Sequence, residues 1–205
     1  RMEINGMDNS YIESLRKDVK RALKSDKMRF RHTIGVADTS ACLASRYGVD
    51  MQKAYISGLL HDCAKCVPDE QKITECEQNN IEITKSEYES PYLLHSKLGA
   101  FYADVKYGIK DEDILGAIKW HTTGHPDMTM LDIFIHYAPT FDWKTGLRED
   151  TYGRKQHITK FLFEHSQKAV DKDMGGKTYR RLLDFYKGRR YFRPFTDFDI
   201  HKILY

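Results

Sequence analysis

Side chains of the type that binds transition metals recur along the chain: His32, the adjacent pair His61-Asp62, His95 and His121. A single histidine near an apolar face is more often a hydrogen-bonded core residue than a metal ligand. Several imidazoles and a carboxylate that share one core must compensate one another, and a divalent cation does this directly. The combination therefore predicts a metal centre.

The elements that must position these side chains read as helices, because apolar residues recur at helical spacing. The expected helices cover residues 10–24, 31–47, 51–61, 91–107, a segment capped by Asp111 that leads to His121, and 129–138. Ser10 and Glu13 have the spacing of a capping box, and Gly58 in mid-helix predicts a close backbone approach. Residues 68–90 are polar and predict a connection with at most a short helix. The predicted fold class is all-α.

Composition limits the class of protein. The chain has 205 residues, of which 40% are hydrophobic and 31% charged, as in an ordinary globular domain. No apolar run approaches the roughly 20 residues that cross a bilayer, and no secretory leader is recognisable, so we expect a cytoplasmic protein without a membrane partner. The four cysteines are expected to be free thiols. A redox or zinc role for the CxxC of Cys63 and Cys66 is the weaker alternative, because no second ligand pair follows.

Four stretches carry a family resemblance: RFRHTIGVA (29–37), SGLLHDCAK (57–65), LLHSKLGA (93–100) and AIKWHTTGHPDMTMLDIFI (117–135). The order of histidines and aspartate resembles the HD-domain metallophosphohydrolases. The surrounding residues are similar to the YqeK family, whose members cut diadenosine tetraphosphate symmetrically into two ADP molecules. The similarity covers roughly residues 10 to 138 and implies an HD-domain helical bundle.

The resemblance also implies a ligand set. His32 and His61 would bind one metal ion, and Asp62 would bridge to a second ion held by His95 and His121. Two divalent ions are implied, with iron favoured and manganese or zinc as alternatives, since histidine and carboxylate ligands suit all three. A bridging carboxylate suits two cations about 3.5–4 Å apart, which together stabilise the attacking and leaving oxygens of phosphoryl transfer.

Several polar residues near these positions are candidates for binding substrate phosphates. Lys65 lies one helical turn beyond His61, and we assign it a catalytic role beside Asp62; Arg29 lies three residues before His32. Each has the alternative interpretation of a surface residue whose stem covers apolar atoms. Thr122, Thr123 and Gly124 follow His121 and offer hydroxyl and backbone donors, although a simple turn explains Gly124 equally well.

The sequence departs from the family pattern where a final aspartate is expected, because Pro139 stands there and has no ligating atom. Asp142, three residues further on, is the favoured replacement. His136 or Asp132 is a second possibility, although the family keeps an acid at the position of Asp132 without using it as a ligand. The third is an incomplete first site with weak or no activity.

We expect residues 8–143 to form the HD core and residues 144–205 a basic helical extension packed on it. Residues 151–205 carry 13 Lys and Arg against 6 Asp and Glu. Packing is favoured over nucleic-acid binding for this segment, and a homodimer is compatible with the sequence. The predicted activity is metal-dependent hydrolysis of a dinucleoside polyphosphate. The rivals are hydrolysis of a nucleoside phosphate or guanosine alarmone, and a degenerate domain that binds nucleotide or nucleic acid without turnover.

Overall fold

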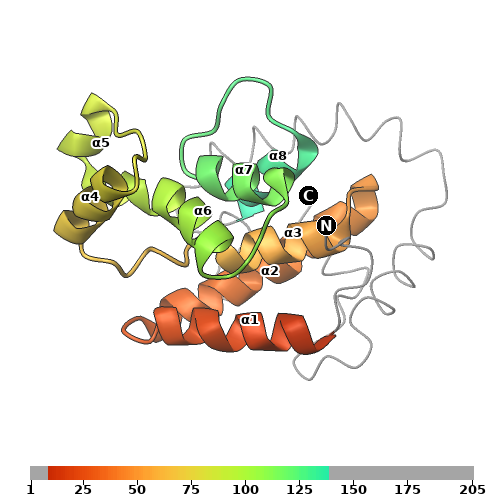
Figure 1. Cartoon of the computed structure of the whole chain (residues 1–205). Coiled ribbons are helices and arrows are strands. Elements are labelled where there is room, and N and C mark those ends of the chain that lie inside the picture. The colour runs from red at the N-terminus through yellow and green to blue at the C-terminus, as the bar shows by residue number, and fades with distance from the viewer. Residues whose placement is uncertain (1–8, 139–205) are drawn as a thin grey trace.

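Helices make up most of residues 9–138, the part of the chain that the computed structural model describes (Figure 1). They are α1 (Asn9–Ala22), α2 (Lys27–Tyr47), α3 (Met51–Leu60), α4 (Asp69–Gln78), α5 (Lys85–Glu89), the 3-10 helix η1 (Pro91–Leu94), α6 (His95–Val105), α7 (Glu112–Trp120) and α8 (Met130–Tyr137). No strand occurs within these residues, which confirms the all-α prediction. The predicted boundaries at residues 8 and 143, the basic extension and Asp142 lie outside the described residues.

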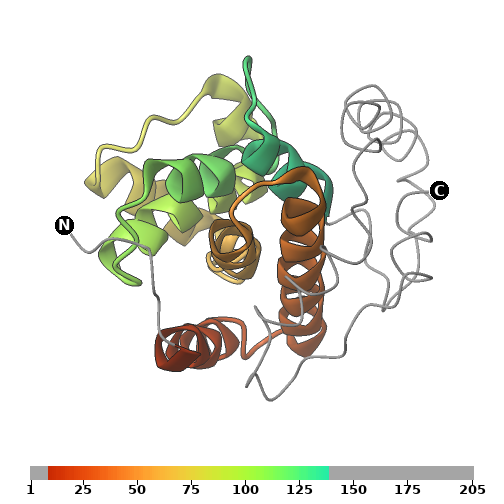
Figure 2. The same cartoon turned by 90° about the vertical axis from the view of Figure 1, so that its right-hand side faces the viewer.

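Helix α3 is the centre of the bundle, and the others are arranged around it (Figure 2). Every residue from Ala54 to Leu60 is buried, and the helix packs against α1, α2, α6, α7 and α8. A helix that is apolar on all sides is stable only when other elements surround it. Because His61 and Asp62 follow directly after Leu60, the chain delivers them to the middle of the molecule.

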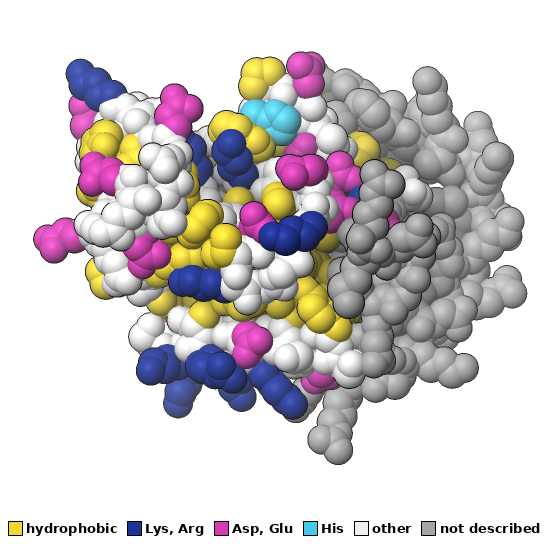
Figure 3. Space-filling model, viewed as in Figure 1, with side chains coloured by type: hydrophobic (Ala, Val, Ile, Leu, Met, Phe, Trp, Pro, Cys, Tyr) yellow, Lys and Arg dark blue, Asp and Glu magenta, His cyan; other side chains and the backbone are white. Residues whose placement is uncertain are grey.

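Helix α1 has one apolar face and one basic face. Ile12, Leu15 and Val19 are buried at helical spacing on the inner side, and Leu23 is buried just after the helix ends. On the outer side, Lys and Arg side chains gather over this helix (Figure 3). Helix α1 therefore closes one side of the bundle and contributes no residue to the histidine cluster.

Helices α2 and α3 approach each other closely at Gly58. A Cβ atom added there would lie 2.7 Å from the Cα of Ala37, which is backbone and cannot move aside easily. This confirms the close backbone approach that the sequence predicted. The contact places α2, which carries His32, directly against the helix that leads to His61.

Three local predictions are corrected by the structure. Helix α1 begins at Asn9, so Ser10 lies inside the helix and is not its N-cap as the capping-box pattern suggested. Helix α2 begins four residues before the expected start, because Asp26 caps it and accepts a hydrogen bond from the Arg29 amide. Residues 68–90 contain two helices, α4 and α5, where at most one short helix was expected. Here Pro68 precedes the acidic first turn of α4 and Thr84 caps α5.

None of the helices between residues 9 and 138 combines the length and apolar composition that crossing a lipid bilayer requires.

A buried ion pair ties α5 to α6, and we expect it to make stability depend on pH. Lys97 Nζ lies 2.8 Å from Glu87 Oε2, which also accepts hydrogen bonds from Thr84. Burial by itself raises the pKa of the Glu87 carboxyl, but Lys97 and Thr84 outweigh it and lower that pKa below its ordinary value. The stabilisation is then complete above the unfolded pKa of about 4.3 and is lost as pH falls through the lower folded value.

The replacement Glu87→Gln should therefore cost about 2–3 kcal/mol of unfolding free energy near pH 7, and the difference from wild type should shrink below about pH 4. Urea denaturation over a pH series measures this. Glu89→Gln is the control, because Glu89 lies on the same helix with its side chain 67% exposed. The prediction would be contradicted if the free energy of unfolding depended on pH in the same way in the two variants.

Candidate metal centre

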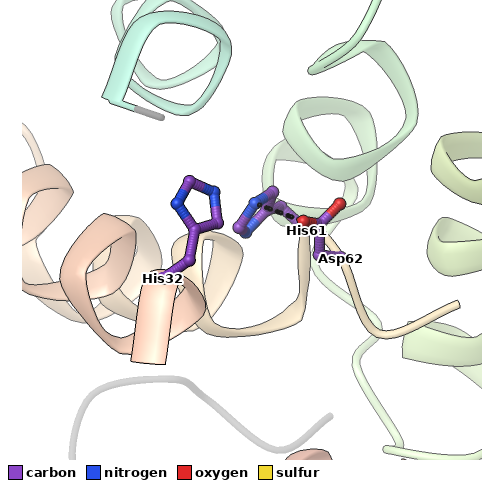
Figure 4. Close-up of side chains that lie close together, drawn as sticks. All are labelled: His32, His61 and Asp62. Atoms are coloured by element: carbon purple, nitrogen blue, oxygen red, sulfur yellow. Dashed lines mark ion pairs between the residues drawn. The ribbon is translucent and has the colours of Figure 1, made fainter. Parts of the chain in front are cut away.

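The side chains singled out by type and spacing converge at one point of the bundle. His32 comes from α2, His61 and Asp62 follow α3, His95 is the first residue of α6, and His121 follows α7. They form two groups with ligand atoms within 4.8 Å of one another: His32, His61 and Asp62, and Asp62, His95 and His121. The rings of His32 and His61 lie side by side, with Asp62 on the far side of His61 (Figure 4).

Asp62 belongs to both groups, and its two oxygens face different neighbours. Oδ2 lies 3.4 Å from Nε2 of His61. Oδ1 lies 3.3 Å from Nε2 of His95 and 3.8 Å from Nε2 of His121. A carboxylate placed in this way has the geometry of a bridge between two cation subsites.

Backbone carbonyls hold the imidazole rings in one orientation. Nδ1 of His61 lies 2.7 Å from the Gly58 carbonyl oxygen, and Nδ1 of His121 lies 2.8 Å from that of Ile118. Nδ1 of His95 lies 2.6 Å from the Tyr92 oxygen in η1. Since a carbonyl only accepts, each Nδ1 carries the proton and each Nε2 presents a lone pair.

These lone pairs point at one another, which is unfavourable without a positive partner. Nε2 of His95 lies 3.1 Å from Nε2 of His121. Two acceptors at this distance in a buried site repel unless a cation or a proton stands beside them. In this structure the Lys65 ammonium is such a cation, 3.3 Å from Nε2 of His95, and the same set of donor atoms is of the kind that could hold a divalent metal ion.

Burial favours the neutral form of two imidazoles in the cluster, those of His95 and His121. His121 is 7% exposed, and burial together with the nearby His61 and His95 lowers its pKa well below the ordinary value. Burial also lowers the pKa of His95. For Asp62 burial acts in the opposite direction, but the surrounding imidazoles outweigh it and hold the carboxyl pKa well below its usual range. Neutral imidazoles and an ionised carboxylate are the ligand forms.

The two predicted phosphate-binding cations lie against the cluster. Arg29 Nη1 is 3.1 Å from Asp62 Oδ2. Lys65 Nζ is 3.3 Å from Nε2 and 3.4 Å from Nδ1 of His95, and burial lowers the pKa of the lysine. Both cations therefore lie beside atoms that would ligate a metal. The sequence indicated that they are near the site but not that they contact the ligands.

The turn after α7 brings only one of its three predicted residues into the cluster. Thr122 Oγ1 lies 3.2 Å from Nε2 of His121 and 3.4 Å from Nε2 of His95. The Thr123 hydroxyl donates to the Gly124 carbonyl, and the Gly124 amide donates to the Trp120 carbonyl. The Gly124 N–H is thus already used at the end of α7. At Gly124 the backbone has a φ of 67°, which is typical of a turn.

The structure shows what two of the three candidates for the missing ligand, Asp132 and His136, contact. Asp132 accepts from the amide and hydroxyl of Thr129 in a capping box and lies 3.3 Å from His125, so its carboxylate stabilises the start of α8. His136 is not part of either ligand group, and its Nδ1 lies 2.7 Å from the carbonyl oxygen of His121. Asp142 remains a prediction.

The CxxC cysteines take no part in the cluster. Cys63 is buried, Cys66 is partly buried, and both are free thiols. Burial raises the pKa of the Cys63 thiol to about 12, so it is not a reactive thiolate. Among the side chains that the structure describes, the groups able to hold a metal contain only histidine and aspartate.

Comparison with known proteins agrees with this arrangement. Residues 29–157 match the HD domain, and the chain belongs to the HD-domain family. Within it, the chain is 39% identical over 110 residues to the symmetrical bis(5'-nucleosyl)-tetraphosphatase of Halalkalibacterium halodurans, covering 54% of this chain and 58% of the relative. It is 30% identical to the protein of the same name from Staphylococcus aureus, covering 72% of this chain and 78% of the relative. The resemblance to the YqeK type is confirmed.

One solved structure is similar to this chain. It is a predicted HD superfamily hydrolase involved in NAD metabolism from Clostridium acetobutylicum, 29% identical, with a TM-score of 0.64 and coverage of 97% of this chain and 98% of the other. The chain nevertheless spans about three fifths of the length of the first curated relatives that it matches, 58% and 59%.

Proposed function

We propose that this protein hydrolyses a dinucleoside polyphosphate, with diadenosine tetraphosphate as the substrate and two ADP molecules as the products. The observation that carries the proposal is the position of Asp62, which directs one oxygen to each of two histidine groups. Paired metal subsites joined by a carboxylate suit in-line displacement at phosphorus. The names of the curated relatives support the choice of substrate.

In this reaction a water oxygen forms a bond to one of the two central phosphorus atoms, and the bond from that phosphorus to the central bridging oxygen breaks. The bridging oxygen leaves on the second ADP, and the water protons pass to solvent. Metal ions held by His32, His61, Asp62, His95 and His121 would activate the water and neutralise the phosphate charge. We propose two such ions, with iron favoured.

Arg29 and Lys65 have a defined part in this proposal. Each lies beside an atom that a metal ion would ligate, Asp62 Oδ2 and His95 Nε2 respectively. A metal ion held by that atom would repel the neighbouring side-chain cation, which would then be available to bind phosphate oxygens. The two residues then bind the polyphosphate on either side of Asp62, with the Thr122 hydroxyl as a neutral donor.

The replacement Lys65→Met should lower kcat/KM for diadenosine tetraphosphate by about 10–100-fold, because a charge-assisted contact of about 1.5–3 kcal/mol to the phosphates is lost. Metal content should stay at the wild-type level, since Lys65 is not a ligand. Steady-state kinetics and elemental analysis measure the two quantities. Lys119→Met is the matched control, because Lys119 is exposed and its ammonium lies over Trp120. Unchanged kinetics in Lys65→Met would remove this residue from the proposal.

The substrate is tested by product analysis with the metal-loaded protein. We expect diadenosine tetraphosphate to give ADP as the sole nucleotide product. AMP with ATP would show asymmetric cleavage and contradict the proposal. Nucleoside triphosphates, guanosine tetraphosphate alarmones and NAD⁺ belong in the same screen, the last because of the NAD metabolism named for the solved relative. Cleavage of one of these with no cleavage of diadenosine tetraphosphate would favour the other-nucleotide alternative.

Pro139 motivates a second candidate, a degenerate domain that binds nucleotide without turnover. We propose instead that Asp142 completes the first metal subsite. Metal content distinguishes the two: two equivalents with turnover support the enzyme, and one or none with nucleotide binding alone supports the degenerate domain. Asp142→Ala should lower metal content if Asp142 is the replacement ligand.

The proposal also includes the cellular location and the oligomeric state of the enzyme. Free thiols at Cys63, Cys66 and Cys76 are typical of a reducing compartment, which supports a cytoplasmic location. A homodimer is compatible with this proposal, and size-exclusion chromatography with light scattering tests it.

A further inference from the structure

Helix α8 contacts the metal centre through a residue to which neither the family resemblance nor the ligand geometry assigns a role. Nδ1 of His136 lies 2.7 Å from the carbonyl oxygen of His121, fifteen residues away in sequence. Because a carbonyl only accepts, Nδ1 of His136 carries the proton and donates it. The contact therefore joins α8 to the backbone of a candidate metal ligand.

The carbonyl that His136 binds belongs to the open end of a helix. Helix α7 ends at Trp120, and the last carbonyls of a helix have no partner inside it. The Gly124 amide satisfies the Trp120 carbonyl. His136 satisfies the next one, so the residue that carries the ligand ring is held by a hydrogen bond from outside α7.

The turn after α7 passes near the His136 ring at Gly124. A Cβ atom added at Gly124 would lie 3.3 Å from Met128 Sδ and 4.0 Å from His136 Cε1. The same turn carries Thr122, whose hydroxyl lies 3.2 Å from Nε2 of His121. Two groups at this turn face the cluster, the His121 ring and the Thr122 hydroxyl. A residue that holds the His121 backbone in place therefore helps to position both.

We propose that His136 is a positioning residue for the subsite formed by Asp62, His95 and His121, and that it acts through its hydrogen bond to the His121 carbonyl. The inference rests on the proposed role of His121 as a ligand. It differs from ligation by His136 itself, because the nitrogen that acts here is Nδ1 and its partner is backbone. Loss of a supporting hydrogen bond around a ligand typically lowers metal affinity by about 10–100-fold.

Two variants separate the nitrogens of His136. In His136→Asn the side-chain amide nitrogen lies near the position of Nδ1, so the donor is kept and Nε2 is lost. In His136→Gln the amide lies near the position of Nε2, and the donor at Nδ1 is lost. Binding of Mn²⁺ to the metal-free full chain, followed by the electron paramagnetic resonance of the free ion, measures the affinity. The variant His121→Ala should lose the Mn²⁺ equivalent that belongs to this subsite and thereby identifies it.

We expect His136→Gln to bind that equivalent about 10-fold more weakly and His136→Asn to bind it as wild type does. The affinity for the other Mn²⁺ equivalent should be unchanged in both variants. A general loss of stability would instead weaken the binding of both equivalents. Wild-type binding in His136→Gln, or equal weakening in both variants, overturns the inference while His121→Ala still shows its loss. Full Mn²⁺ binding by His121→Ala would overturn the proposed metal site, and the role of His136 with it.

Discussion

The replacement Asp62→Asn should abolish hydrolysis, lowering kcat by about 10³-fold or more, and should deplete the protein of metal. Asn has the same shape but lacks the negative charge, and Asp62 is the one residue that belongs to both ligand groups of the described chain. Its Oδ2 is also the partner of Arg29, so the variant leaves that guanidinium without its ion pair. Both subsites are therefore affected by one change.

Elemental analysis of the purified variant and a kinetic assay with diadenosine tetraphosphate measure these losses. Circular dichroism shows whether the fold is retained, which we expect because the helices around Asp62 are held by apolar packing. Asp104→Asn is the control, since this carboxylate lies near the end of α6 with its side chain 38% exposed. Full metal content with wild-type turnover in Asp62→Asn would defeat the assignment of the site.

The second large effect is expected at Gly58, which has no side chain to act as a ligand but whose carbonyl oxygen lies 2.7 Å from Nδ1 of His61. In Gly58→Ala the new methyl group would lie 2.7 Å from Cα, and 3.0 Å from N, of Ala37, so α2 and α3 must move apart. Overpacking of this kind costs about 1–3 kcal/mol, more than the gain of roughly 1 kcal/mol from replacing glycine in a helix. The same movement separates His32 from His61, and a displacement of about 1 Å in a catalytic arrangement can cost 100-fold in rate.

Thermal unfolding and metal content measure this result. Gly116→Ala is a matched control, because Gly116 is also within a helix and a Cβ there meets nothing within 4 Å. In Gly116→Ala the free energy of unfolding should be unchanged or higher by up to about 1 kcal/mol. Equal stability of the two variants would show that α2 and α3 yield at this contact without cost.

The two predictions concern different levels of the structure. Asp62 acts through its charge, which decides whether cations stay in the site. Gly58 acts through its lack of a side chain, which decides how closely two helices approach. A metal centre built from the ends of separate helices depends on both, because each ligand is only as well placed as the packing of its helix.

The sequence by itself was sufficient to predict the helical class, the histidines and aspartate that the fold brings together, and most of the helices that carry them. These features are local, since helical periodicity and the residue types that bind metals can be read from neighbouring positions. The sequence also predicted the close approach at Gly58 and the cap at Asp111, which the structure confirms. The start of α1 was missed by one residue. The start of α2 was missed because Asp26 caps the helix four residues before the predicted start, and α4 was missed because most of its residues are polar.

Only the tertiary structure decided how the side chains face one another. The division of the Asp62 oxygens between two groups, the contacts of Arg29 and Lys65 with ligand atoms, and the bond from His136 to the His121 carbonyl each join residues from different helices. Such contacts depend on the angle and depth at which helices pack, and no spacing within one segment contains that information.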